Sequence, residues 1–117
     1  MDTREIGKLG ESYVCSYLKR SGYQIVGKNW NCYGGELDII AKKNFLTFIV
    51  VKFVRNEYFC SPHELFTKKK QKHLQRTINK YLLMNKLNNI DWRMDLICLC
   101  RRGGKIDLRH YRSVDLL

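Results

Sequence analysis

The segment from Phe45 to Val54 constrains the fold of this chain more than any other. It is a long run of mostly β-branched and aromatic residues, which is the composition of a β-strand. A second segment with strand character, Glu36 to Ala41, precedes it, and only Lys42-Lys43-Asn44 separates the two. A polar connection this short predicts a turn, so we expect the two strands to form a hairpin.

A helix is predicted before this hairpin. Its apolar stripe consists of Ile6, Leu9, Tyr13, Val14, Tyr17 and Leu18. Thr3 is its expected N-cap, and Gly22 is expected to end it. Gly7 and Gly10 lie inside the helix, where each glycine is unfavourable by about 1 kcal/mol relative to alanine. We expect these two glycines to allow close approach of a neighbouring element.

Three more strands and a second helical region complete the predicted elements. The strands span Tyr23 to Trp30, Trp92 to Cys100 and Lys105 to Tyr111, with glycine-containing connections at 31–35 and 101–104. The helical region begins at Ser61-Pro62 and is expected to break near Lys68. The order α-β-β-β-α-β-β predicts an α/β fold, a single domain over residues 1–117 with a mixed central β-sheet flanked by helices. The second helical region is expected to cross over between the third and fourth strands.

The chain is strongly basic, which favours a polyanionic partner. It has 22 Lys and Arg residues against 11 Asp and Glu residues, so its formal net charge is +11. Basic side chains that contact phosphates release condensed counterions, so we expect DNA or structured RNA as the partner. The candidate contacts are Lys68, Lys69, Lys70, Lys72 and Arg76 in the second helical region, and Arg101 and Arg102 at the last turn. A solvated helix face is the alternative explanation for the lysine run. No apolar run approaches the roughly 20 residues of a membrane span.

The cysteines indicate a reducing compartment. They are Cys15, Cys32, Cys60, Cys98 and Cys100, an odd number without a C-x-x-C pair. This pattern argues against a disulfide framework or a zinc site and favours reduced thiols. The N-terminus has no apolar signal-peptide segment, so we expect a cytoplasmic protein.

Three charged residues interrupt the apolar strands of the hairpin. Because side chains alternate, Glu36 and Asp38 share a face with Ile40, and Lys52 shares one with Val50 and Phe48. Burying an unpaired carboxylate is costly. One interpretation is a cross-strand salt bridge between Asp38 and Lys52, and the bare residues favour it. The other is a phosphodiesterase site, in which carboxylates hold Mg²⁺ and a lysine stabilises developing charge.

Several motifs, in this order, resemble the YraN family of small bacterial proteins. They are Gly7-Lys8-Leu9-Gly10-Glu11, Tyr17-Leu18, Gly22-Tyr23, Asn29-Trp30, Gly35-Glu36-Leu37-Asp38-Ile39-Ile40-Ala41, Lys70-Gln71 and Trp92-Arg93-Met94-Asp95-Leu96. Together they cover nearly the whole chain. The resemblance implies a restriction-endonuclease-like core related to archaeal Holliday-junction resolvases.

This resemblance also implies roles for individual residues. Glu11 matches the helix glutamate of the nuclease site, Asp38 the strand aspartate and Lys52 the lysine, while Gln71 resembles a polar residue of the following helix. Val50, however, stands where the family pattern has glutamate, and valine does not ligate metals. Mg²⁺ binding should therefore be weakened. Asp38 with Glu36 is the expected remaining ligand pair, and Glu11 is a further candidate. A structural role for Glu36 is an equally good explanation.

The sequence thus predicts a nucleic-acid-binding protein with weak or absent cleavage activity. An active Mg²⁺-dependent endonuclease on branched or single-stranded DNA is one alternative. A protein-interaction module on an inactive nuclease scaffold is another. A homodimer is compatible with each of these, because related nucleases often dimerise.

Overall fold

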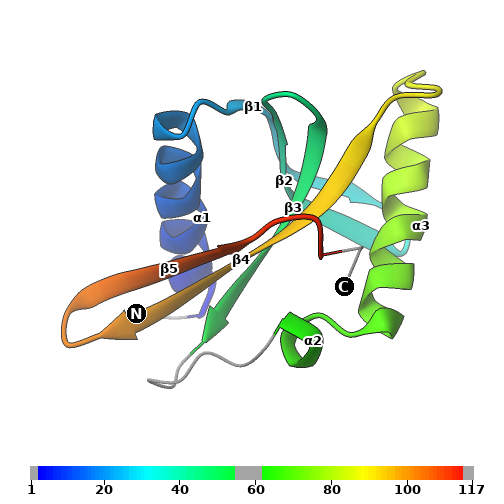
Figure 1. Ribbon diagram of the computed structural model, residues 1–117. Helices are drawn as coiled ribbons and strands as arrows, with labels where there is room; N and C mark the ends of the chain where they lie inside the picture. The colour runs from blue at the N-terminus through cyan, green and yellow to red at the C-terminus, as the bar shows by residue number, and fades with distance from the viewer. Residues whose placement is uncertain (1–2, 55–61, 115–117) are drawn as a thin grey trace.

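The predicted α/β fold, with a mixed sheet flanked by helices, is confirmed (Figure 1). The computed structural model describes residues 3–54 and 62–114, except for the side chains of residues 3–6, 63 and 102. The elements are α1 (Thr3–Arg20), β1 (Gln24–Cys32), β2 (Gly35–Lys42), β3 (Leu46–Val54), α2 (Pro62–Leu65), α3 (Lys68–Met84), β4 (Trp92–Arg102) and β5 (Lys105–Tyr111). The break before Lys68 is confirmed, because α2 and α3 are separate helices. The side chain of Thr3, the expected N-cap of α1, and Ser61, the expected start of the second helical region, lie outside the described residues.

The five strands form one sheet in chain order, β1-β2-β3-β4-β5. Neighbouring strands pair antiparallel except β3 and β4, which are parallel over Leu46–Val54 and Trp92–Cys100. The predicted hairpin of β2 and β3 is therefore confirmed, and so is the helical crossover from β3 to β4, which a parallel pair requires.

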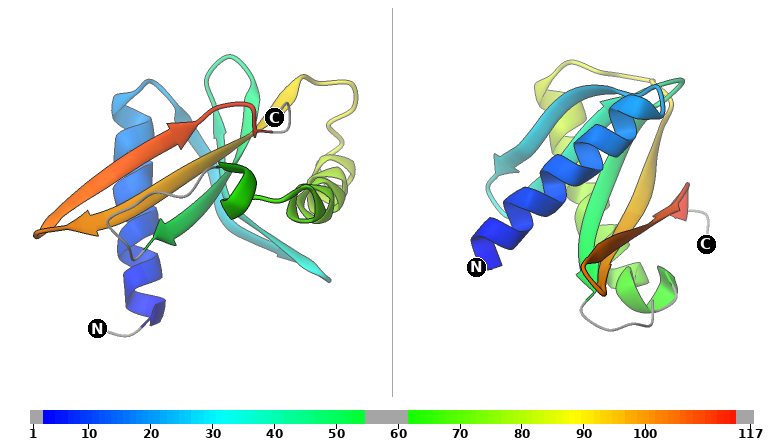
Figure 2. Two further views of the ribbon diagram at one scale, coloured as in Figure 1. Left: turned by 60° about the horizontal axis from the view of Figure 1, so that its bottom comes forward. Right: turned by 90° about the vertical axis from the view of Figure 1, so that its left-hand side faces the viewer.

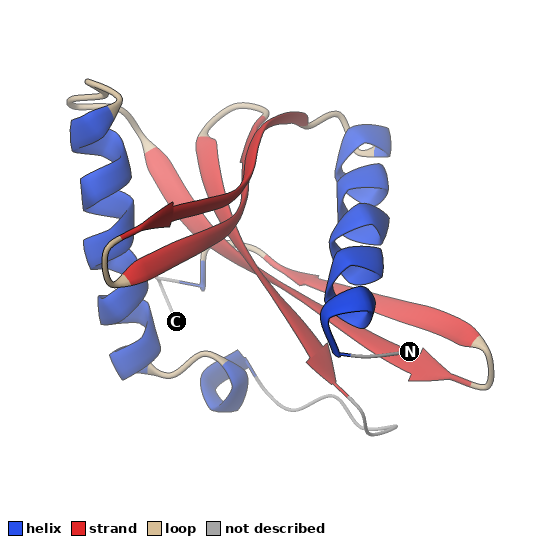
Figure 3. Cartoon of the chain, turned by 180° about the vertical axis from the view of Figure 1, so that it is seen from behind, coloured by secondary structure: helices blue, strands red, loops and turns tan. Residues whose placement is uncertain are grey.

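Helices cover the two faces of the sheet, α1 on one and α3 on the other (Figures 2 and 3). The α1 side buries Val14 and Leu18 against Ile39, Ile49 and Ile97. On the α3 side, Phe48, Ile78, Met94 and Leu96 are among the buried residues. Strands β3 and β4 are thus covered on both faces, which explains why their sequences are almost continuously apolar. None of the described helices combines the length and the apolarity that crossing a membrane requires.

The packing of α1 differs in part from the predicted stripe. Gly10 faces the sheet, and a Cβ at this position would lie 2.5 Å from the Phe53 ring and 3.4 Å from Leu99. Close approach is thus confirmed for Gly10 and wrong for Gly7, whose missing Cβ would have no neighbour within 4 Å. Leu9 is 57% exposed, so its place in the stripe was also wrong. The line that packs is Gly10, Val14 and Leu18, each four residues apart.

β1 and β2 pair as a second hairpin, which was not predicted, and its turn contacts α3. Asn31 and Cys32, expected in a loop, pair with Glu36 and Gly35, so only Tyr33 and Gly34 form the turn. Gly34 has a φ of +86°, a conformation that glycine adopts without strain. The strand β4 also runs on to Arg102, two residues beyond its expected end.

Both tryptophans pack against aromatic residues. Trp30 contacts the Tyr81 ring edge-on with centroids 5.3 Å apart. Trp92 contacts the Phe48 ring in the same manner at 5.8 Å. No disulfide joins the described cysteines; Cys60 lies outside the described residues.

A buried carboxylate, Asp95, ties β4, β5 and α1 together. It forms an ion pair with Arg93, whose Nε lies 3.2 Å from Oδ1. It has two further partners: Nε2 of His110 donates to Oδ2 at 2.7 Å, and the N–H of Ser113 donates to Oδ1 at 3.0 Å. The other ring nitrogen of His110 hydrogen-bonds the Tyr17 hydroxyl at 2.8 Å, which links this network to α1. Asp95 has no exposed surface, so these partners offset the cost of burying its charge.

Candidate nucleic-acid interface

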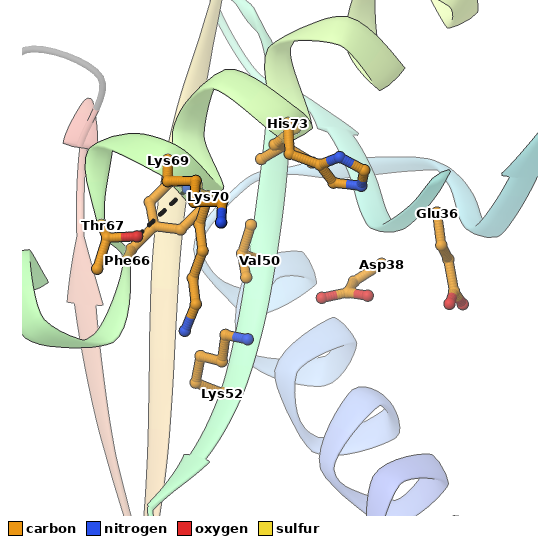
Figure 4. Close-up of a pocket in the computed structure, with 10 residues that line it drawn as sticks. Glu36, Asp38, Val50, Lys52, Phe66, Thr67, Lys69, Lys70 and His73 are labelled. Atoms are coloured by element: carbon orange, nitrogen blue, oxygen red, sulfur yellow. Dashed lines mark hydrogen bonds between the residues drawn. The ribbon is translucent and has the colours of Figure 1, made fainter. Parts of the chain in front are cut away.

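A groove of about 580 Å³ opens between strands β2 and β3 and the start of α3 (Figure 4). The strands contribute two carboxylates, one lysine and one apolar side chain, and α3 with the turn before it contributes basic, polar and apolar ones. The lining residues are Glu36, Asp38, Val50, Lys52, Phe66, Thr67, Lys69, Lys70, His73 and Leu74. The groove therefore brings charges of both signs to one place.

The groove lies where β2 and β3 separate. Their backbone pairing extends from Lys42↔Leu46 to Ile39↔Ile49. At the next residue of β2, a side chain replaces the backbone as the hydrogen-bond acceptor: Oδ2 of Asp38 accepts the backbone N–H of Val51 at 3.0 Å. The carboxylate therefore accepts the hydrogen bond that a backbone carbonyl of β2 would otherwise accept. The two strands separate beyond this point.

The position of Asp38 tests the cross-strand salt bridge expected with Lys52. No ion pair joins Asp38 to Lys52, both of which the structure describes, so the cross-strand salt bridge was wrong. Both side chains instead line the groove, with Val50 beside them (Figure 4). The predicted alternation is confirmed, because Glu36 and Asp38 of β2 and Val50 and Lys52 of β3 share this face.

Asp38 is held in a site that opposes its ionisation. Burial is the main reason why the pKa of the Asp38 carboxyl is raised. The Val51 N–H lowers this pKa, the negative charges of Glu36 and Glu11 raise it, and Lys52 lowers it. The net effect is upward, which means that a cation near this carboxylate would be favourable.

Two of the residues that the resemblance assigns to the site lie outside the groove. Glu11 is near enough for its charge to affect Asp38, but its Oε2 accepts a hydrogen bond from Nδ2 of Asn29 at 2.9 Å. Gln71 is buried in α3, and its Nε2 donates to the carbonyl of Phe66 at 3.3 Å. Gln71 therefore stabilises the turn between α2 and α3 by this hydrogen bond, and it does not line the groove.

The predicted basic residues fall into separate regions. Lys69 and Lys70 line the groove, while Lys68, Lys72 and Arg76 are exposed elsewhere on α3. Arg101 is exposed at the β4–β5 turn, on the side of the molecule away from α3 (Figures 1 and 3). The side chain of Arg102 is not described. The structure thus brings two of the predicted basic residues to the groove.

Sequence reasoning missed four lining residues, Phe66, Thr67, His73 and Leu74. His73 is exposed on α3, three and four residues after Lys70 and Lys69, so helical spacing would have placed all three on one face. Thr67 is the N-cap of α3 and accepts the backbone N–H of Lys70 at 3.3 Å. A Ser or Thr just before a helical lysine run is therefore a signal that could have located this end of the groove.

The donor set does not fit a complete Mg²⁺ site. Mg²⁺ requires oxygen ligands in near-octahedral geometry, and Asp38 and Glu36 are the carboxylates that line the groove. Val50 contributes only an apolar side chain to the groove, and Glu11 accepts a hydrogen bond from Asn29. Among the described residues, no three His, Cys, Asp or Glu side chains are grouped so that they could hold a metal ion.

Residues 10–99 match the family described as uncharacterised protein family UPF0102. The chain belongs to this family, which is the YraN family. A UPF0102 protein of Carboxydothermus hydrogenoformans is 34% identical over 115 residues, covering 97% of this chain and 98% of the relative. UPF0102 proteins of Caldicellulosiruptor saccharolyticus and Campylobacter jejuni are 39% and 43% identical over 98 and 94 residues, about four-fifths of each chain. The family predicted from the motifs is confirmed.

Proposed function

We propose that this protein binds DNA or structured RNA through the groove between β2, β3 and α3, with weak or absent cleavage activity. The observation that carries the proposal is the convergence of three lysines on this groove: Lys52 from β3, and Lys69 and Lys70 from α3. Phosphate oxygens are the natural partners of clustered ammonium groups in a chain whose formal charge is +11. Such contacts position a nucleic acid without reading its sequence.

Weak cleavage follows from the mixture of groups beside these lysines. Asp38 and Lys52 are present, as a phosphodiesterase site would require, but Val50 offers no ligand atom. Two carboxylates near one wall of the groove provide too few oxygens to hold Mg²⁺ firmly. The lysines, by contrast, need no metal to contact phosphates.

Charge reversal on α3 tests the proposal. The variant Lys69→Glu/Lys70→Glu is compared with Lys8→Glu/Lys19→Glu, which makes the same change at exposed sites of α1 on the other face. Affinity for duplex DNA and for an RNA hairpin is measured by fluorescence anisotropy over a range of salt. The α3 variant should bind at least about tenfold more weakly than the control and reduce the salt slope by about 2, because each phosphate contact contributes about one unit. Affinity independent of ionic strength, or equal loss in both variants, would contradict the proposal.

An active Mg²⁺-dependent endonuclease is the second candidate, since Asp38 and Lys52 share the groove. Branched, duplex and single-stranded DNA are incubated with the wild type and with Asp38→Ala in Mg²⁺ or Mn²⁺. Cleavage that disappears in Asp38→Ala would favour the enzyme; no cleavage under any condition would remove it. A protein-interaction module would be favoured if no nucleic acid bound and partner binding survived charge reversal on α3.

A further inference from the structure

We infer that Tyr33 is a stacking platform for an unpaired base, presented beside the phosphate-binding face of α3. The inference rests on the proposed function and deepens it, because it names nucleic acid with unpaired bases as the preferred class. Tyr33 occupies the turn between β1 and β2, and its side chain is 97% exposed. Among the ring contacts of the described residues, none involves Tyr33. Its faces are therefore open to a ligand.

Three contacts hold the tip of the β1–β2 hairpin against α3. Nζ of Lys80 donates to the carbonyl of Tyr33 at 3.0 Å. Gly35 presses against the side chain of Thr77 so closely that a Cβ would collide with it. Trp30, further along β1, packs edge-on against Tyr81 of α3. The ring is thus presented from a braced position, which lowers the entropic cost of binding because only its own two torsions remain to be ordered.

A line of basic side chains connects the groove with Tyr33. Lys69, His73, Arg76 and Lys80 follow one another on α3 at intervals of three or four residues, so they share one side of the helix. All four are exposed, and the line extends over about 16 Å at the 1.5 Å rise of an α-helix. Lys80 donates to the Tyr33 carbonyl with one N–H and retains two further donors for a phosphate. A strand whose phosphates follow this line would bring a base to the tyrosine ring (Figure 1 shows the hairpin tip beside α3).

Stacking on Tyr33 requires a base with an open face. In a continuous duplex each base is covered by its neighbours, whereas a single-stranded tail or an unpaired junction nucleotide exposes its ring. Stacking on an aromatic side chain tolerates any sequence, because every base has a π-face. The tyrosine therefore favours an unpaired base over paired bases, while the lysines attract both.

Three fluorescent DNA probes test this inference: a blunt duplex, the same duplex with a single-stranded tail, and the single strand. Tyr33→Ala should weaken binding of the tailed and single-stranded probes by about five- to a hundredfold, and leave the blunt duplex unchanged. Tyr33→Phe should retain binding, since the ring remains. Phe45→Ala, which removes another exposed aromatic at the β2–β3 turn, is the control and should change none of the three affinities. In Tyr33→Trp, addition of the tailed probe should quench the new indole fluorescence beyond any quenching in the wild type.

The outcomes separate this inference from the proposed function. Equal loss for all three probes in Tyr33→Ala, or no loss together with no quenching in Tyr33→Trp, overturns the stacking platform. If the Lys69→Glu/Lys70→Glu variant still loses affinity in that case, the proposed function stands. A wild type that binds none of the probes overturns both. Thermal unfolding should be unchanged in the Tyr33 variants because the side chain is exposed at a turn.

Discussion

At the scale of single residues, Asp38 combines a structural and a functional position. Its carboxylate replaces a backbone partner for Val51 and so ends the pairing of β2 and β3, while the same side chain lines the groove. Burial and the charges of Glu36 and Glu11 raise its pKa. The residue therefore opens the site at a cost in stability, which is common where a fold holds functional groups.

The raised pKa of Asp38 predicts a pH-dependent effect of Asp38→Asn. The folded state prefers the protonated carboxyl, so this group contributes stability below its unfolded pKa and loses that contribution as pH rises through its folded pKa. At neutral pH the asparagine variant should therefore be more stable than the wild type, because its Oδ1 can still accept the Val51 N–H. The gain should disappear as the pH falls below the unfolded pKa. Urea unfolding of both proteins, from neutral pH to below the unfolded pKa, measures the difference in their free energies of unfolding. A difference that does not change with pH would contradict the prediction.

Val50 is the residue that separates a binding groove from a metal site. Val50→Glu adds a carboxylate to a half-buried position and, without metal, should lower the free energy of unfolding by about 1–3 kcal/mol. If the groove then holds Mg²⁺, the ion should raise the melting temperature of this variant and support cleavage of a junction substrate. Val50→Gln has nearly the same shape without the charge and should show neither effect. A Val50→Glu protein whose melting ignores Mg²⁺ would argue against a nuclease-type site.

Asp95 should be among the least replaceable side chains. Asp95→Ala would remove the partner of Arg93, of His110 and of the Ser113 N–H from a site with no solvent exposure. Breaking a buried ion pair in this way typically costs about 3–5 kcal/mol. Denaturant unfolding of Asp95→Ala and of Asp91→Ala, at an exposed site just before β4, gives the comparison. The control should lie within about 0.5 kcal/mol of the wild type. Similar stability of the two variants would show that the network contributes little.

At the scale of elements, α1 carries a matched pair of glycines with opposite expected effects. Gly7→Ala adds a Cβ into open space on a helix and should stabilise the protein by about 0.5–1 kcal/mol. Gly10→Ala forces a Cβ against the Phe53 ring and Leu99, so the helix or the ring must shift, at a cost of about 1–3 kcal/mol. Urea unfolding of the two single variants distinguishes the effects. A stabilising Gly10→Ala would mean that Phe53, which is 39% exposed, moves aside freely.

The elements also differ in how well their sequences predicted them. The alternation in β2 and β3 correctly placed Glu36, Asp38, Val50 and Lys52 on one face, because neighbouring side chains of any strand point in opposite directions. The α1 stripe was predicted less well, since helical spacing allowed Leu9 in the stripe but Gly10 faces the sheet. A small residue can face a neighbour that a larger one would displace, and hydrophobicity alone does not reveal this.

At the scale of the whole molecule, the two predicted basic groups lie on different sides. The α3 group adjoins the groove, whereas Arg101 lies at the β4–β5 turn across the molecule, whose longest dimension is 45 Å. A duplex of about 6 base pairs is roughly 20 Å long, less than half of this dimension, so we expect it to engage one basic group at a time. Arg101→Glu/Lys105→Glu should therefore leave the affinity for such a probe unchanged and weaken binding of a duplex longer than the protein. Anisotropy with both lengths measures this. Equal loss for both lengths would place the short duplex at the β4–β5 turn.

The sequence by itself determined the order of the elements, the hairpin of β2 and β3, the net charge and the family. These properties depend on composition and on residues close together in the chain, where periodicity is set by backbone geometry. Only the tertiary structure decided that Asp38 accepts the Val51 N–H, that Gln71 turns inward and that the β1–β2 turn rests on α3. Tyr17 and His110, 93 residues apart, meet for the same reason. Such contacts depend on how twisted strands and helices pack in three dimensions. Patterns among residues close in the sequence do not predict this packing.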